Sequence, residues 1–232
     1  MNRELQTDSL QLSNDLNLIK AAIFDLDGVI VDTAHYHYLA WKKLAHEFGF
    51  ELTPEDNERL KGVSRIRSME IIMEIGGINL SGEEKNRHAN RKNDWFIEYI
   101  KGMKPDEVFP GVISLIEDLR ERGYVIALAS SSKNAPMVLD ILGIRNYFDV
   151  IVDGTMIVHS KPHPEIFLLA AARLGVDPSE CVVFEDAEAG VEAALAAGMK
   201  CVGVGSKEQL GKADYVIEKT GMFRPELVSE LA

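Results

Sequence analysis

The chain has 232 residues, of which 46% are hydrophobic and 27% charged, and its formal net charge at pH 7 is −12. These values are typical of a soluble globular protein of one or two domains. The excess of negative charge argues against nucleic acid or an anionic membrane surface as a partner, and no apolar run approaches the roughly 20 residues that a membrane span needs.

The N-terminal 17 residues are polar and lack both the apolar segment and the small-residue cleavage site of a secretory signal. We interpret them as a polar extension without a role in chemistry. Cys181 and Cys201 each lie in an apolar run, with no spacing that suggests a pair or a metal site. They are predicted to be reduced core thiols of a cytoplasmic protein.

Short apolar runs of the kind found in buried parallel strands recur along the chain. They lie at residues 19–24, 124–129, 149–152, 181–185, 201–205 and 215–217. Helical patterns separate the later runs, and one of them begins near Pro164 and ends before Gly175, which is ordinary helix punctuation. Strands alternating with helices predict an α/β fold with a doubly wound parallel sheet.

Residues 34–104 interrupt this alternation, because they contain helical patterns but no convincing strand. A helical block of about 70 residues directly after the first strand predicts a cap over the carboxyl edge of the sheet, where ligands bind in open α/β folds. The predicted organisation is a polar extension at 1–17, an α/β core at 18–33 and 105–232, and a helical cap at 34–104.

Two aspartates follow the first predicted strand, in the segment "AAIFDLDGVIVDT". Side chains at positions i and i+2 of an extended segment point to the same side, so Asp25 and Asp27 can converge above the sheet. Gly28 permits a turn immediately afterwards. The competing interpretation is a solvated turn that simply needs polar residues.

Polar residues also follow the later strands, and each has an ordinary structural explanation when it is taken alone. The serines of "ASSSKN" could cap a helix or bind an anion at its N-terminus. Lys161, held extended by the following proline, could be a solvated surface residue. Glu185 and Asp186 could complement a helix dipole. Together with Asp25 and Asp27, however, these acids make four carboxylates at two strand ends, which need a cation to remain ionised. Oxygen-only ligands favour Mg²⁺.

Four segments in this order and spacing, "FDLDGVIVDT", "ASSSKN", "SKPHPEIF" and "FEDAEAG", resemble the signature motifs of the haloacid dehalogenase superfamily of phosphotransferases. The resemblance covers about residues 19–220. Further segments at 32–42, 60–65, 90–94 and 132–134 are similar to the β-phosphoglucomutase branch of that superfamily. This branch interconverts β-D-glucose 1-phosphate and D-glucose 6-phosphate through glucose 1,6-bisphosphate. The resemblance therefore implies an isomerase that uses one Mg²⁺, acts on a small phosphorylated sugar and works as a monomer.

The resemblance also implies a role for each matching residue. Asp25 would be the nucleophile that forms an aspartyl phosphate, and Asp27 the general acid and base. Mg²⁺ would be held by Asp25, the Asp27 backbone carbonyl, Glu185 and Asp186, and the transferring phosphoryl group by Ser130, the Ser131 amide and Lys161. The remaining matches would hold the second phosphate (Arg65, Ser132, Asn134), contact the sugar or gate the pocket (Trp41, Gly62, Val63, Ser68, Lys92) or lie at the hinge (Thr33, His37).

The chain departs from the family at three places. Ser131 stands where a smaller residue is common, residues 153–160 ("DGTMIVHS") resemble the family poorly, and the N-terminal extension has no counterpart. Two other functions stay open at this point. A Mg²⁺-dependent sugar-phosphate phosphatase would need the same core without a second phosphate site. A non-catalytic phosphate-binding regulator is disfavoured by the presence of both Asp25 and Asp27.

Overall fold

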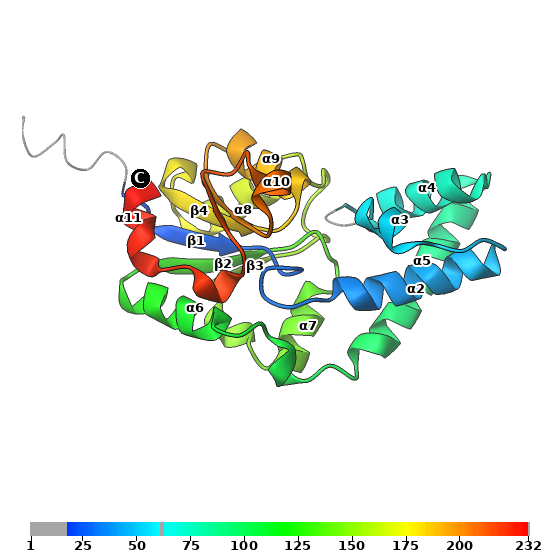
Figure 1. The fold of residues 1–232 in the computed structure, drawn as a ribbon, viewed down its shortest axis with the longest axis horizontal. Helices are drawn as coiled ribbons and strands as arrows, with labels where there is room; N and C mark the ends of the chain where they lie inside the picture. Colours follow the sequence, from blue (N-terminus) through cyan, green and yellow to red (C-terminus); the bar gives the residue numbers. More distant parts are fainter. Residues whose placement is uncertain (1–17, 61–62, 232) are drawn as a thin grey trace, which may run out of the picture.

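A computed structural model of the protein describes residues 18–60 and 63–231, apart from the side chains of residues 229 and 230. The predicted extension at 1–17 and the predicted sugar-contacting residue Gly62 lie outside the described residues. The architecture is a six-stranded parallel sheet flanked by helices, with a separate group of helices inserted after the first strand (Figure 1). The predicted fold class is confirmed.

The strands form at or beside the predicted apolar runs, and each is hydrogen-bonded in parallel to its neighbours. They are β1 (Ala21–Phe24), β2 (Val125–Ala129), β3 (Val150–Val152), β4 (Cys181–Glu185), β5 (Lys200–Val204) and β6 (Tyr215–Ile217). The order across the sheet is β3-β2-β1-β4-β5-β6. The strand order therefore reverses beside β1, with β2 on one side and β4 on the other, and such a switch point is where open α/β sheets bind ligands.

Helices cover both faces of the sheet, which makes every residue of β1 buried. Ala22 and Phe24 pack in one hydrophobic cluster with α6 (Val112–Glu121) and α7 (Ala135–Leu142). Ala21 and Ile23 pack in a second cluster with α8 (Glu165–Leu174) and α9 (Glu188–Ala196). Because successive side chains of a strand point to opposite faces, a continuous apolar run places hydrophobic side chains in the helix layers on both faces of the sheet.

The inserted helices form the cap and lie beyond the carboxyl end of the sheet (Figure 1). They are α2 (Ala34–Glu47), α3 (Pro54–Glu58), α4 (Arg65–Gly76) and α5 (Gly82–Ile100). Their apolar faces pack into a cluster of their own that includes Trp41, Leu44, Ile72 and Ala89. The cap thus has its own hydrophobic core.

Local sequence signals determine where several helices begin and end. Ser81 accepts a hydrogen bond from the Glu84 amide, and the Glu84 side chain accepts one from the Ser81 amide, which is a capping box at the start of α5. Gly143 and Gly175 end α7 and α8 in the left-handed conformation that glycine adopts without strain. The remaining short helices are α10 (Lys207–Leu210) and α11 (Val228–Leu231), with 3₁₀ turns at Pro105–Glu107, Arg145–Tyr147, Pro178–Glu180, Thr220–Met222 and Pro225–Leu227.

The two chain segments that join cap and core are paired where they leave the sheet. Val31 forms an antiparallel bridge with Val108, and the Phe109 amide donates a 2.9 Å hydrogen bond to the Ile30 carbonyl.

Cys181 and Cys201 are both buried and free, in β4 and β5. Within residues 18–60 and 63–231, no helix is both long and apolar enough to cross a membrane.

Candidate active site

Three carboxylates converge at the switch point of the sheet. Asp25 follows β1 directly, and its amide donates to the Phe184 carbonyl of β4 at 3.0 Å. Glu185 is the last residue of β4 and Asp186 the next, so parallel pairing of β1 with β4 brings all three to the same edge. One oxygen of each carboxylate lies within 4.8 Å of the other two. This is an all-oxygen donor set.

Lys161 lies behind the carboxylates and neutralises part of their charge. Its Nζ donates to Asp25 at 2.6 Å and lies 3.4 Å from both oxygens of Glu185, while only 4% of the residue is exposed. Burial by itself lowers the pKa of Lys161, but Asp25 and Glu185 more than offset that effect, so the pKa lies above its ordinary value. The lysine is therefore cationic at neutral pH.

Two glycines leave room for this cluster. A Cβ on Gly28, whose φ is +72°, would overlap the carboxylate of Asp186, and a Cβ on Gly190 would overlap that of Glu185. Burial raises the pKa of Glu185, Lys161 opposes the rise, and Asp25 and Asp186 add to it. A divalent cation among these oxygens would keep the group ionised, so the residues present fit Mg²⁺ in donor type and charge.

This fit makes a prediction about Gly190. Replacing it by alanine forces the Glu185 carboxylate to move, and we expect the free energy of unfolding to fall by about 1–3 kcal/mol and Mg²⁺ binding to weaken. Urea denaturation with and without Mg²⁺ measures both effects. Gly82→Ala is the matched control, because no atom of the described residues beyond the adjoining backbone lies within 4 Å of a Cβ placed there. Equal stability of the two variants would contradict the prediction.

Asp27 lies beside the cluster, and its carboxylate accepts a hydrogen bond from a residue outside the cluster. Thr33, buried at the start of the cap, donates through its hydroxyl to the Asp27 carboxylate. The Gly28 amide donates to the Val31 carbonyl at 2.9 Å, which closes the turn that follows. Burial first, and then the charges of Asp25 and Asp186, raise the pKa of Asp27 well above its usual value. This carboxyl therefore retains a proton more readily than an ordinary aspartate does.

A cavity of about 440 Å³ separates the sheet edge from the cap. Thirteen of the predicted site residues line it: Asp25, Asp27, His37, Trp41, Val63, Arg65, Ser68, Lys92, Ser130, Ser131, Ser132, Asn134 and Asp186. Lys161 and Glu185 lie behind it in contact with each other and, through Lys161, with Asp25. Thr33 is not among the described residues that line the cavity, but its hydroxyl donates a hydrogen bond to Asp27, which does line it.

The serine loop after β2 presents polar groups to this cavity. The hydroxyl of Ser130 accepts from the Ser132 amide, and the hydroxyl of Ser132 accepts from the Asn134 amide, both at 3.2 Å. Asn134 is the N-cap of α7, and within the part of the chain that the structure describes its side chain forms no cap hydrogen bond. The Ser131 hydroxyl is buried with no hydrogen-bond partner among the described residues. It is thus available to a bound polar group.

The cap contributes a buried lysine, Lys92 of α5, of which only 2% is exposed. Its Nζ donates to His37 Nδ1 at 2.6 Å and lies 4.5 Å from the centre of the Trp41 ring. Burial and then the charge of Arg65 lower the pKa of Lys92, whereas Asp27 raises it. Burial, Lys92 and Arg65 also lower the pKa of His37, so this imidazole is neutral and can accept the bond.

Arg65, the first residue of α4, lines the cavity and is half-buried. Its guanidinium donates to the Asn90 side chain at 3.4 Å. Arg67, two residues later on the same helix, is instead exposed and pairs with Glu70 and Glu74. Of these two arginines, Arg65 therefore faces the cavity and Arg67 faces the surface.

Several cavity residues were not predicted, most clearly three asparagines of α5: Asn86, Asn90 and Asn93. Asn93 also accepts a 2.7 Å hydrogen bond from the Asn134 side chain, which joins the cap to the core. The available signal was their spacing of i, i+4 and i+7, which places three uncharged amides on one helix face. Such a stripe suits hydroxyl-rich ligands.

Comparison with known proteins agrees with this geometry. The chain matches the family described as haloacid dehalogenase-like hydrolase over residues 19–198. It belongs to the haloacid dehalogenase-like hydrolase family. Within this family it is 44% identical to a β-phosphoglucomutase of Bacillus subtilis, over 91% of this chain and 95% of that protein. It is 35% identical to a phosphorylated carbohydrates phosphatase of Thermotoga maritima, over 90% of this chain and 95% of that protein.

A solved structure of similar sequence has the same fold. The β-phosphoglucomutase of Clostridium difficile superposes with a TM-score of 0.89 at 45% identity, covering 92% of this chain and 97% of that one. The agreement extends over core and cap together.

Proposed function

We propose that the protein is a β-phosphoglucomutase, an isomerase that interconverts β-D-glucose 1-phosphate and D-glucose 6-phosphate. The observation that carries this function is that two sites able to hold a phosphate group face one cavity. Lys161 and the carboxylate cluster lie at the sheet edge, and Arg65 lies on the cap. A sugar that exchanges phosphate between its two ends needs a place for each phosphate. The similarity to the Bacillus subtilis β-phosphoglucomutase supports the proposal.

In the proposed reaction Asp25 carries the phosphoryl group as an aspartyl phosphate. A hydroxyl of the sugar phosphate attacks that phosphorus, its proton passes to Asp27, and the bond from phosphorus to Asp25 breaks. Glucose 1,6-bisphosphate results. After the bisphosphate turns over in the cavity, Asp25 attacks the other phosphorus and Asp27 returns the proton to the departing sugar oxygen. The second half of the cycle thus restores both Asp25, as the aspartyl phosphate, and Asp27, as the ionised carboxylate.

The charge that builds up on the transferring phosphoryl group must be balanced. Lys161 supplies a fixed cation next to Asp25. Asp25, Glu185, Asp186 and the backbone carbonyl of Asp27 would hold Mg²⁺, which supplies a Lewis acid for the phosphoryl oxygens when it is bound. Ser130 and the Ser131 amide would bind the same phosphoryl group.

The second phosphate would rest on Arg65 with Ser132 and Asn134, which all line the cavity. Lys92, Trp41, Val63 and Ser68 would contact the sugar. The bond from Asn134 to Asn93 holds cap and core together and so helps to exclude water, which would otherwise hydrolyse the aspartyl phosphate. Because one chain supplies both phosphate sites, we propose that it works as a monomer, which light scattering would test.

The alternative is a sugar-phosphate phosphatase, since one relative at 35% identity bears the name phosphorylated carbohydrates phosphatase. The two functions differ in product. Incubation with β-glucose 1-phosphate, Mg²⁺ and a trace of glucose 1,6-bisphosphate should yield glucose 6-phosphate far faster than inorganic phosphate. Stoichiometric release of inorganic phosphate without glucose 6-phosphate would establish the phosphatase.

Arg65→Ala tests the second phosphate site. A charged hydrogen-bonding partner is worth about 1.5–3 kcal/mol, so we expect kcat/KM for isomerisation to fall roughly 10- to 150-fold. Phosphorylation of Asp25 by acetyl phosphate should stay nearly unchanged, because that donor has no second phosphate. Arg67→Ala is the matched control on the same helix. Unchanged isomerisation by Arg65→Ala would contradict the placement of the second phosphate on Arg65.

A further inference from the structure

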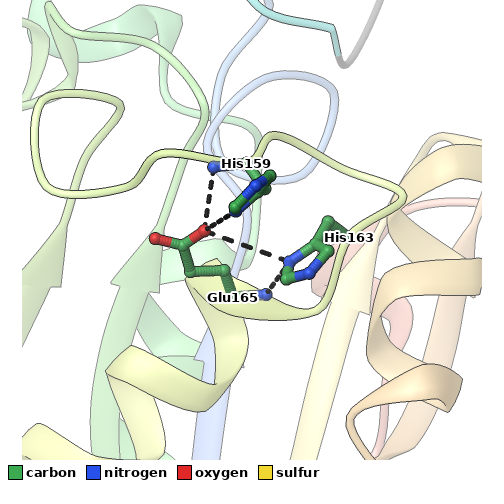
Figure 2. A group of neighbouring side chains, drawn as sticks. All are labelled: His159, His163 and Glu165. Carbon is green, nitrogen blue, oxygen red and sulfur yellow. Dashed lines mark hydrogen bonds and ion pairs between the residues drawn. The ribbon is translucent and has the colours of Figure 1, made fainter.

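A second group of potential metal ligands lies on the loop between β3 and α8 and at the first residue of α8. It consists of His159, His163 and Glu165, whose two imidazole rings and carboxylate face one another (Figure 2). One donor atom of each residue lies within 4.8 Å of the other two, and the ring centroids are 4.6 Å apart. Among the described residues, the cavity lining includes Val158 and Ser160 but none of these three.

The carboxylate of this group is already fixed by the backbone. The Val158 amide donates to Glu165 Oε1 at 2.9 Å and the His159 amide donates to Oε2 at 2.8 Å. These two bonds lower the pKa of Glu165 to about 2, so the side chain is ionised. Oε2 also lies 2.9 Å from Nδ1 of His159 and 4.0 Å from Nδ1 of His163. One anionic oxygen therefore faces both rings.

The imidazoles are accessible, and one has a defined lone pair. The Glu165 amide donates to His163 Nδ1 at 3.2 Å (Figure 2), and because a backbone amide can only donate, that nitrogen is unprotonated. The side chains of His159 and His163 are 62% and 52% exposed. An ion can thus reach the group from solvent without opening the cavity.

We propose that His159, His163 and Glu165 form a binding site for a divalent transition-metal ion, for which Zn²⁺ is the natural probe. Two imidazoles and a carboxylate are a set that Zn²⁺ accepts with water in the fourth position, at about 2.0–2.2 Å from each ligand. Tetrahedral ligands at that distance are about 3.3 Å apart, so the 4.0 Å separation of His163 from Glu165 must shrink by less than about 1 Å. An ion bound at His163 Nδ1 would replace the hydrogen bond from the Glu165 amide.

The proposed site differs in selectivity from the carboxylate cluster at the sheet edge. Imidazole nitrogen suits zinc, copper and nickel, whereas Mg²⁺ prefers oxygen. Its position also matters, because His159 and His163 lie on either side of Lys161 in the sequence. An ion bound to both histidines would restrain the loop that carries this lysine.

The test uses untagged protein in millimolar Mg²⁺, which occupies the oxygen cluster, and measures Zn²⁺ binding by competition with a chromogenic chelator. We expect the wild type to bind one more Zn²⁺ per chain than the variant His159→Gln/His163→Gln. Each single substitution should weaken this site at least about tenfold. His35→Gln/His46→Gln, which removes two histidines outside the group, should bind like the wild type. Glu165 is left intact because it also holds the loop backbone.

Amide hydrogen exchange then shows which segment of the chain binds the ion. Zn²⁺ should slow amide exchange in a peptide covering residues 157–166 in the wild type, and not in His159→Gln/His163→Gln. Thermal melting in the presence of a chelator verifies that the variants are folded. Equal number and affinity of Zn²⁺ ions in wild type and double variant, or slowed exchange only elsewhere in the chain, would overturn the proposal.

Discussion

Asp25→Asn is expected to abolish both isomerisation and hydrolysis, with kcat falling on the order of 10⁴-fold or more. The amide is a neutral, poor nucleophile, and the substitution also removes one of the three carboxylates that converge at the switch point. Chelation of Mg²⁺ should have the same effect on the unmodified protein and should be reversed by added Mg²⁺. Steady-state formation of glucose 6-phosphate measures both.

The control for this experiment is Asp106→Asn, an exposed aspartate of the 3₁₀ turn that follows the cap. It should retain full activity. Intact mass spectrometry of Asp25→Asn is required, because deamidation would restore the aspartate. Substantial turnover by a sample shown to be free of deamidation would remove Asp25 from the role of nucleophile.

Asp27→Asn should slow phosphoryl transfer to and from sugar oxygens by about 10²- to 10⁴-fold, the usual contribution of a general acid or base. The asparagine can occupy the same space beside Thr33, but it can neither take up nor return the proton. Phosphorylation of Asp25 by acetyl phosphate should change much less, because acetate leaves readily without being protonated. Single-turnover measurements with the two donors separate these effects.

The ratio between the two donors is the informative quantity. A variant that loses both reactions equally has a damaged site, and near-normal rates with the sugar phosphate would mean that another group moves the proton. Thermal melting shows whether the variant is folded. Only a selective loss with the sugar substrate agrees with the proposed role of Asp27.

Much of the fold could be predicted, because parallel strands buried on both faces read as continuous apolar runs. The predicted ends of the strands are less accurate than their positions along the chain. The first predicted strand began at residue 19, whereas β1 begins at Ala21, since hydrophobic burial continues past the hydrogen-bonded ladder and Ile19 is buried outside it. The polar residues at strand ends could be grouped from sequence, because the carboxyl ends of parallel strands share one edge.

The cap was less predictable at the level of side chains. An amphipathic helix pattern shows which face is apolar, and it does not show that Asn86, Asn90 and Asn93 of α5 turn toward a cavity. That depends on how the cap is placed over the sheet, which is a long-range property. Similarly, sequence placed Lys161 at the sheet edge, but the 2.6 Å contact with Asp25 requires the fold of the whole β3–α8 loop.

The bridge between Val31 and Val108 has a consequence for the order in which the chain folds. β1 pairs with β2 across on the order of 100 residues, and closing a longer loop costs chain entropy of about 0.6 kcal/mol per doubling of length. Because the cap has its own hydrophobic cluster and its two ends meet at this bridge, early folding of the cap shortens the remaining loop roughly fourfold. That lowers the entropic cost of joining β1 to β2 by about 1.2 kcal/mol. Early folding of the insertion therefore offsets the delay that its length would otherwise impose on the sheet, and stopped-flow refolding of a chain with a weakened bridge is expected to be slower.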